Sequence, residues 1–482
     1  MLSAAPSLEA LRARFGARYR WIALAIVMVG AIASLLSSTI VNVALPQLSR
    51  HFGVGNEQAQ WVSSVHMAAT TVTMLALPWL LARFGLRRLF FLAMALLATG
   101  SLVGGLAPDF RVLVSMRVLQ GAASGLLQPL ATVLILRAFP QGEQGRASGY
   151  YGFGVVLAPA AGPTVGGVLT DWIGWRAVFF ISLPFALAAA ALAWRLLPAM
   201  AEPAERRGFD WLGMVLVAAF VPMLLVFLVQ LHDHGAASLA ALGWLAAAAA
   251  TAVGLLAWER SADHPLVDFR VFRNRDFRIG TAVALVYGAG LFGSTLMVPL
   301  FVQHALHYSA TQSGALLLPA GLALALTIPL AGRLADRISP RPLVVGGLVA
   351  FGASFALMAA LPAAGFVALA AMLVLGRIGL GMILPALSLG TVRGVEPALL
   401  GQAASLFNFT RMLGGAVGTG AIAIFVESRA KALDALAAAG AAPAGAVPGW
   451  AELRAFQDGF ALLAVLFAIA AAAAFAMRAR TR

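Results

Sequence analysis

The sequence predicts an all-α polytopic membrane protein. Only 11% of the 482 residues are charged, whereas a soluble protein carries about 25%. The mean hydropathy is +0.91, and apolar runs long enough to cross a bilayer follow one another along the chain. Lys and Arg are also distributed unevenly between the connecting segments. That distribution accounts for the net charge of +14 without a nucleic-acid partner.

Fourteen apolar runs reach the length of a transmembrane helix, which is about 20 residues. The first run follows four arginines and is too long for the core of a signal peptide, so we expect an uncleaved first span. No soluble domain fits between the runs. The expected helices lie near 21–45, 58–82, 88–107, 110–136, 147–169, 177–197, 211–231, 238–258, 279–302, 313–332, 342–361, 365–390, 401–426 and 457–477.

The basic residues indicate the orientation, because cytoplasmic loops of membrane proteins are enriched in Lys and Arg. With the N-terminus inside, the expected cytoplasmic segments hold 24 of the 33 basic residues, and the outer segments hold 6. The other three, Arg117, Arg377 and Arg411, lie within expected helices. This alternation favours an even number of helices and two cytoplasmic termini. The absence of Cys excludes disulfides and thiolate metal sites.

The fifth expected helix, residues 147–169, is rich in glycine and proline for a spanning segment. In lipid the backbone must satisfy its own hydrogen bonds, so the helix forms despite the low helix propensity of these residues. Small residues then let a neighbouring helix approach closely, and we expect Pro163 to kink the helix. Close packing as in any membrane protein is the alternative. The helix surface on which we expect a neighbouring helix to slide consists of Gly149, Ala158, Gly162, Pro163, Gly166 and Gly167.

Segments of the chain recur at a nearly constant offset. Arg117 has a counterpart in Arg377, Gly162 has one in Gly418, and the loop segment RFGLRR has one in DRISPR, with offsets of 254 to 260 residues. This pattern indicates two parallel six-helix repeats with room for two extra helices between them, although chance similarity is the alternative. The expected divisions are an N-terminal bundle at 1–200, two inserted helices at 201–262 and a C-terminal bundle at 263–482.

Five motifs add to the glycine pattern of the fifth helix. They are TIVNVALP (Thr39–Pro46), Arg117-x2-Gln120-Gly121, WRAVFFISLP (Trp175–Pro184), PLVDFRVFRNRDF (Pro265–Phe277) and GQAASLFNFTRMLGG (Gly401–Gly415). Taken together, they resemble the fourteen-helix drug:proton antiporter branch of the major facilitator superfamily. The resemblance implies the major facilitator fold, with two six-helix bundles and two inserted helices. It also implies export of drug-like or amphipathic molecules by alternating access, in exchange for protons, in a bacterial inner membrane.

The chain departs from the family pattern at several positions. Ser37 stands where the first-helix signature carries Asp, and Ser182 stands where a later motif carries Asn. The cytoplasmic-loop motif is intact in the second half as GRLADR, but Pro78 and Ala82 replace its Gly and Asp in the first half. The resemblance therefore implies a cytoplasmic gate that lacks one of the charged contacts that the family uses between its two halves. Its expected residues are Arg83, Gly332, Asp336 and Arg337.

No acidic residue is expected in the middle of a span, although a proton-driven exporter usually carries a titratable group there. His66 is the deepest candidate, since imidazole titrates near physiological pH. Ser37, His66 and Arg117 each lie seven or eight residues from the outer end of their expected helix, which is about 10–12 Å at 1.5 Å per residue. The expected substrate and proton pathway of the first half comprises Ser37, Asn42, His66, Arg117 and Gln120.

Each of these residues also has a structural interpretation. His66 could be a neutral histidine hydrogen-bonded to a backbone carbonyl, and Arg117 could bridge backbone carbonyls. In the second half, Asn408 and Arg411 share one helical turn, and Tyr287 is among the aromatic residues that could line an apolar pocket. Because the buried charges are arginines, we expect neutral or anionic ligands to be preferred over cations.

Three classes of function can be compared. A membrane-embedded transferase would need a catalytic carboxylate, a His/Asp pair or a metal site, but H-E-x-x-H, D-x-D and G-x-S-x-G are all absent. A channel or interaction subunit is disfavoured by the repeats. We therefore expect a transporter rather than an enzyme, with no cofactor, no metal and no phosphate loop for ATP. Its expected partners are a small-molecule substrate, protons, membrane lipid and a periplasmic adaptor protein. An uncoupled or importing permease for an anionic or neutral metabolite is the runner-up.

Overall fold

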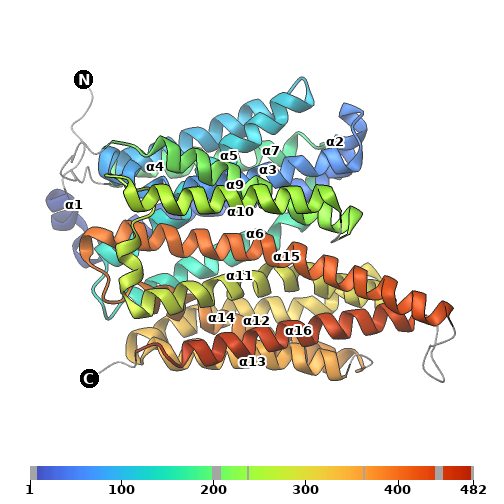
Figure 1. The fold of residues 1–482 in the computed structure, drawn as a ribbon. Coiled ribbons are helices and arrows are strands. Elements are labelled where there is room, and N and C mark those ends of the chain that lie inside the picture. The colour runs from blue at the N-terminus through green and yellow to red at the C-terminus, as the bar shows by residue number, and fades with distance from the viewer. Residues whose placement is uncertain (1–7, 198–207, 236–237, 362–363, 440–448, 479–482) are drawn as a thin grey trace. The chain divides into compact units, whose positions relative to one another are not determined.

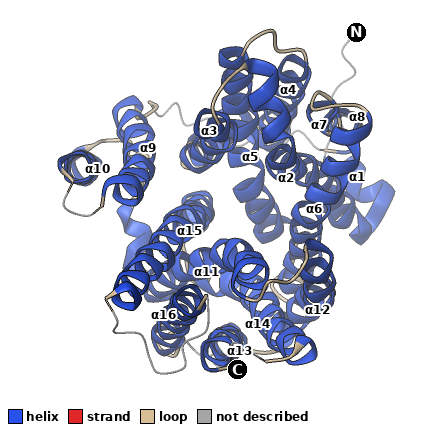
Figure 2. Cartoon of the chain, turned by 90° about the vertical axis from the view of Figure 1, so that its right-hand side faces the viewer, coloured by secondary structure: helices blue, strands red, loops and turns tan. Residues whose placement is uncertain are grey.

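The computed structural model describes residues 8–197, 208–235, 238–361, 364–439 and 449–478 (Figure 1). All regular structure in these ranges is helical, as Figure 2 shows, so the predicted all-α class is confirmed. The helices of the first half are α1 (Leu8–Phe15), α2 (Tyr19–Phe52), α3 (Asn56–Met74), α4 (Leu77–Gly105), α5 (Phe110–Ala138), α6 (Gln144–Trp172), α7 (Ala177–Phe180) and α8 (Ser182–Leu196).

The remaining long helices follow in chain order. They are α9 (Trp211–His234), α10 (Leu239–Ser261), α11 (Arg275–Leu300), α12 (Ala310–Arg337), α13 (Pro340–Ala360), α14 (Phe366–Val392), α15 (Leu400–Ala438) and α16 (Trp450–Ala474). A π-helical turn, Phe301–Ala305, extends α11. Short polar motifs begin some of these helices. Ser309 and Gln312, for example, form a reciprocal capping box at the start of α12.

Twelve of the described helices are long and apolar enough to cross a membrane. Helices α3 and α6 are not among these twelve, although they are 19 and 29 residues long and occupy the second and fifth expected spans. Within α4 the backbone leaves helical geometry at Gly85, which has φ 70° and ψ 165°. This break falls between the expected spans 58–82 and 88–107. The full count of fourteen spans stays a prediction.

The chain divides into two compact units. Unit 1 contains Met1–Pro222, Ala250–Val271 and Val395–Phe409, and unit 2 contains Met223–Ala249, Phe272–Gly394 and Thr410–Arg482. Corresponding helices pack alike inside each unit. Helix α5 packs against α3 and α4, just as α14 packs against α12 and α13, and α2 packs against α8 as α11 does against α16. This repeated packing agrees with the recurring motifs. The division at residues 200 and 262 stays a prediction.

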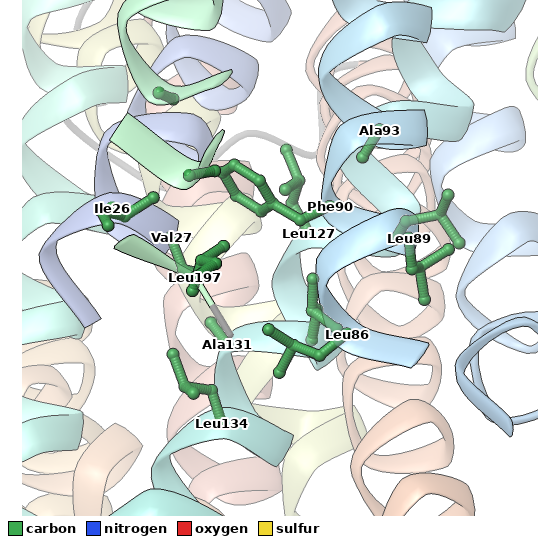
Figure 3. Packing of buried hydrophobic residues seen from close by; sticks show 14 of the residues in the cluster. Ile26, Val27, Leu86, Leu89, Phe90, Ala93, Leu127, Ala131, Leu134 and Leu197 are labelled. Carbon is green, nitrogen blue, oxygen red and sulfur yellow. The ribbon is translucent and has the colours of Figure 1, made fainter. Parts of the chain in front are cut away.

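The core of unit 1 is an apolar cluster formed by several helices. Phe90 of α4 is fully buried among Val27 of α2, Leu127 of α5 and their neighbours (Figure 3). Inside a bilayer, burial of such side chains gains little from leaving water, because lipid tails are equally apolar. Close van der Waals packing therefore supplies the stabilisation. This cluster fixes α2, α4 and α5 and thereby positions the polar residues that lie further along the same helices.

Candidate functional site

Arg117 is the centre of a buried polar network in unit 1. Its side chain is 0% exposed, although it carries a full charge. Its Nε donates to the carbonyl of Val62 in α3 at 2.8 Å, and its Nη1 donates to the carbonyl of Ser37 in α2 at 3.1 Å. Nη1 also donates to Gln120 Oε1, one turn further along α5, at 2.7 Å. Arg117 therefore joins three helices through hydrogen bonds, which is how a cation is tolerated in a span.

The network continues from Gln120 to two serines that are not among the expected pathway residues. Gln120 Nε2 donates to Ser101 Oγ of α4 at 3.0 Å, and the hydroxyls of Ser101 and Ser182 lie 2.7 Å apart. Ser182 in turn donates to the Phe179 carbonyl. Ser182 is the residue that replaces the family Asn. Its departure from the motif was the signal that could have identified it.

His66 lies beside this network, one turn beyond Val62 on α3. The side chain is buried, and its Nε2 lies 3.5 Å from Ser124 Oγ, which donates to the Gln120 carbonyl at 3.0 Å. The other ring nitrogen, Nδ1, is buried and has no hydrogen-bond partner in the part of the chain that the structure describes. One nitrogen of the imidazole is therefore buried without a hydrogen bond to any described residue.

The structure brings together Ser37, His66, Arg117 and Gln120 but not Asn42. Asn42 is exposed on α2, and its Oδ1 accepts a hydrogen bond from Ser63 Oγ at 2.6 Å. Asn42 lies five residues beyond Ser37 on α2, which is about 7.5 Å along the helix axis, and on a different face of the helix. The expected five-residue constellation is thus a buried group of four with a separate exposed polar pair.

The interface between α2 and α6 is closely packed at the predicted glycines. A methyl group added at Gly166 would lie 2.7 Å from Ile40 Cγ1 and 2.9 Å from the Ile40 carbonyl oxygen, and one added at Gly162 would overlap the Thr39 hydroxyl. At Gly167 an added methyl group would contact only Val43, at 4.0 Å. Gly149 and Ala158 are buried. The side chain of Pro163 lies outside the described part, and so does the kink expected there.

The expected gate residues lie at helix ends in the two separate units. Arg83 is exposed in α4, two residues before the break at Gly85. Gly332, Asp336 and Arg337 lie in the last two turns of α12. Their joint action as a gate stays a prediction.

The expected second-half pair is divided between the units. Asn408 belongs to unit 1, where its Nδ2 donates to the Ala404 carbonyl at 2.9 Å and to Thr132 Oγ1 of α5 at 3.4 Å. Arg411 belongs to unit 2, is 6% exposed, and its backbone carbonyl lies against Gly288 of α11, the residue after Tyr287. Tyr287 was expected only as a wall of an apolar pocket, because its spacing alone gives no sign that α11 and α15 meet beside it.

Buried carboxylates lie at helix ends, as expected. Glu259, in the last turn of α10, is 3% exposed, and its Oε2 accepts the Val267 N–H at 3.0 Å. Asp210 precedes α9 and accepts hydrogen bonds from the Gly213 N–H and from Trp258 Nε1, each at 2.8 Å. These hydrogen bonds fix the start of α9 and the end of α10, both of which belong to unit 1. No group of three or more His, Asp or Glu suited to a metal occurs among the residues searched, which are those the structure describes.

Comparison with known proteins adds independent information. The sequence profile of the Major Facilitator Superfamily matches residues 27–419. The multidrug export protein EmrB of Haemophilus influenzae is 31% identical over 388 residues, which cover 80% of this chain and 76% of that protein. The tetracenomycin C resistance and export protein of Streptomyces glaucescens is 30% identical over 410 residues, covering 85% and 76%. The structure of the human organic anion transporter MFSD10 (TETRAN) matches with a TM-score of 0.66 at 17% identity and covers 94% of this chain and 99% of that one.

Proposed function

Because the chain belongs to the Major Facilitator Superfamily, we propose that it is a secondary active transporter that exports drug-like or amphipathic small molecules by alternating access, in exchange for protons. Its relatives named as multidrug export and tetracenomycin C export proteins support the export of such molecules. The observation that supports proton exchange is the buried network, in which Arg117 and His66 lie on neighbouring turns of packed helices.

His66 is the proposed proton carrier. Its free Nδ1 can accept a proton, while Nε2 remains beside Ser124 Oγ. The resulting imidazolium would lie in the same buried site as the Arg117 guanidinium, and two like charges in a low dielectric repel each other. Protonation therefore destabilises the arrangement in which Arg117 holds the carbonyls of Ser37 and Val62. A bound proton can shift the equilibrium between two conformations only if it binds more tightly to one of them, and this repulsion provides such a difference.

The proposed conformational change uses the close contact of α2 and α6. Glycines at this interface let the two backbones approach and slide without side chains that interlock. Because α2 carries both Ser37 and the contact with Gly166, a change in the Arg117 network reaches this interface through a single helix. Gate residues Arg83, Gly332, Asp336 and Arg337 are proposed to close the cytoplasmic side.

The proposed setting is the inner membrane of a bacterium, with both termini in the cytoplasm. The chain is a multi-pass membrane protein with twelve candidate spans among its described residues. We propose two six-helix bundles with α9 and α10 as inserted helices and a transport function without enzyme activity. A periplasmic adaptor protein is a candidate partner. An uncoupled or importing permease for an anionic or neutral metabolite is retained as the second function, because Ser37 replaces the family carboxylate.

Proton coupling can be tested in proteoliposomes with an imposed pH gradient and the neutral dye Nile red as the transported probe. We expect the gradient to drive uphill transport by the native protein. His66→Gln retains size and polarity but cannot titrate, so it should abolish uphill transport and retain downhill flux. His51→Gln, which alters an exposed histidine in the same unit, is the matched control. Native flux that ignores the gradient would favour the uncoupled permease, and full coupling in His66→Gln would exclude His66 as the carrier.

A further inference from the structure

Two carboxyl groups of unit 1 meet where the inserted helix pair joins the rest of the chain. Asp210 immediately precedes α9, and Glu259 lies in the last turn of α10. Trp258, the residue before Glu259, donates to Asp210, so the start of α9 and the end of α10 are in contact. Residues 262–271 follow α10 and form the connecting segment, which ends where the chain leaves unit 1 for unit 2.

The two carboxyl groups hold adjacent backbone groups of the connecting segment. Asp210 Oδ2 accepts the Leu266 N–H at 3.3 Å, and Glu259 Oε2 accepts the Val267 N–H at 3.0 Å. Leu266 and Val267 are themselves buried. Asp210 Oδ1 accepts the two further hydrogen bonds described above, so both oxygens of Asp210 have donors.

One oxygen of Glu259 lacks a donor. The residue is 3% exposed, and Oε1 is buried with no hydrogen-bond partner in the described part of the chain. A methyl group added at Gly213 would lie 2.8 Å from Glu259 Oε1 and would overlap Asp210 Oδ2, so both oxygens point to one place beside the first turn of α9. A buried carboxylate oxygen without a donor is costly, and a second carboxylate beside it increases the cost.

No described cation balances this pair, since neither carboxyl group forms an ion pair with a Lys, Arg or His that the structure describes. In the connecting segment, Asp268 is paired with Arg270 at 2.6 Å. Helix α4 contacts the start of α9 through the rings of Trp79 and Phe209, which lie 4.8 Å apart. The other charged or titratable residues of these segments that lie nearest in sequence are exposed, namely Arg83, Arg260, Asp263 and His264.

We propose that Glu259 and Asp210 form a proton-binding site, in which Glu259 Oε1 carries a proton and donates it to Asp210 Oδ2. Protonation turns the unpartnered oxygen into a donor. Asp210 remains the ionised member, because three donors and the positive end of α9 stabilise its charge.

The shared proton attaches the connecting segment to both inserted helices. Its loss leaves two like charges side by side in a buried site, and their repulsion separates the end of α10 and the connecting segment from Asp210. In the proposed orientation this site lies on the cytoplasmic side, so it would respond to cytoplasmic pH. The inference does not depend on His66 or on the proposed export function.

Infrared difference spectroscopy of the full-length protein in detergent tests for the proton, because a protonated carboxyl group absorbs apart from carboxylates. We expect a protonated carboxyl band that disappears as the pH is raised from mildly acidic to mildly alkaline values, and Glu259→Gln should lack it. Asp210→Asn removes the neighbouring charge, so the band should disappear at a pH lower by at least about one unit. A native protein without the band, or an unchanged band in Glu259→Gln, would overturn the proposal.

Because the chain contains no Cys, one introduced thiol can report whether the connecting segment detaches. Leu266→Cys places this thiol at a buried position, and its rate of reaction with a maleimide measures how often the segment opens. Gln141→Cys, at an exposed position of the same unit, corrects for thiolate formation. We expect the rate of Leu266→Cys relative to Gln141→Cys to rise at least about tenfold over the same pH range, because two neighbouring charges repel strongly when they are partly buried.

Matched variants in the Leu266→Cys background identify the group that titrates. Glu259→Gln resembles the protonated acid and should keep the relative rate low at both pH values. His264→Gln removes an exposed imidazole that titrates in a similar range, and it should leave the rise intact. Arg207→Gln removes the arginine three residues before Asp210 and should also leave it intact. A relative rate that ignores pH, or a rise that persists in Glu259→Gln or is lost in His264→Gln or Arg207→Gln, would refute the proposed site.

Discussion

Gly166→Ala is expected to destabilise the protein, whereas Gly167→Ala is not. The methyl group added at Gly166 would lie 2.9 Å from the backbone oxygen of Ile40, and ordinary contact begins at about 3.4 Å. The two backbones must therefore separate by about 0.5 Å, and an overpacked contact of this kind costs about 1–3 kcal/mol. Both substitutions gain about 1 kcal/mol of helix propensity, so their difference isolates the packing cost.

Thermal unfolding of the purified protein in detergent measures this difference, and the rate of Nile red transport provides a second readout. We expect Gly166→Ala to be less stable than Gly167→Ala by about 1–3 kcal/mol and to transport more slowly. Ile40→Ala combined with Gly166→Ala should recover part of the loss, because the Ile40 side chain is the nearest obstacle, at 2.7 Å. Equal stability and equal transport in the two single variants would refute the close contact of α2 and α6 and the sliding role proposed for it.

Two further predictions concern the polar contacts of unit 1. Gln120→Ala leaves Arg117 without one acceptor and Ser101 without its donor, so it should cost about 1–3 kcal/mol in unfolding free energy. Gln47→Ala, which removes one hydrogen bond to the Thr170 carbonyl, should cost less, and a reversed order would contradict the network. Asp210→Ala should destabilise by about 0.5–2 kcal/mol, because it removes the cap of α9. Asp210→Asn retains an acceptor oxygen and removes a charge beside Glu259, so its unfolding temperature should stay near the native value.

The sequence predicts some parts of the site because they depend on local helix geometry. Arg117 and Gln120 share a face at a spacing of three residues, and counting residues from the helix ends placed Ser37, His66 and Arg117 at one depth. Depth alone does not fix the direction in which a side chain points around the helix axis. Asn42 follows Ser37 by five residues, which is about 500°, or about 140° around the helix at 100° per residue. It therefore faces away from the network and lies about 7.5 Å nearer the C-terminal end of α2 than Ser37 does.

Contacts between distant segments could not be predicted from the sequence. Ser101 and Ser182 are small residues in apolar helices, and only the packing of α4 on α8 reveals that their hydroxyls meet. Gly167 belongs to the same glycine pattern as Gly166, but a methyl group added there would contact only the Val43 side chain and no neighbouring backbone. Sequence patterns thus indicate which helices approach closely, whereas the facing residues depend on the three-dimensional packing.

The hydrogen bonds of Arg117 have a consequence for how the chain is made. Arginine near the centre of an inserting helix costs about 2.5–3.5 kcal/mol on the insertion scale, and apolar neighbours must offset that cost. Helices α2 and α3 are synthesised before α5, so the carbonyls of Ser37 and Val62 already lie in the membrane when Arg117 leaves the ribosome. The acceptors are therefore present before the donor arrives. An order of synthesis in which α5 came first would expose this guanidinium to lipid without a partner.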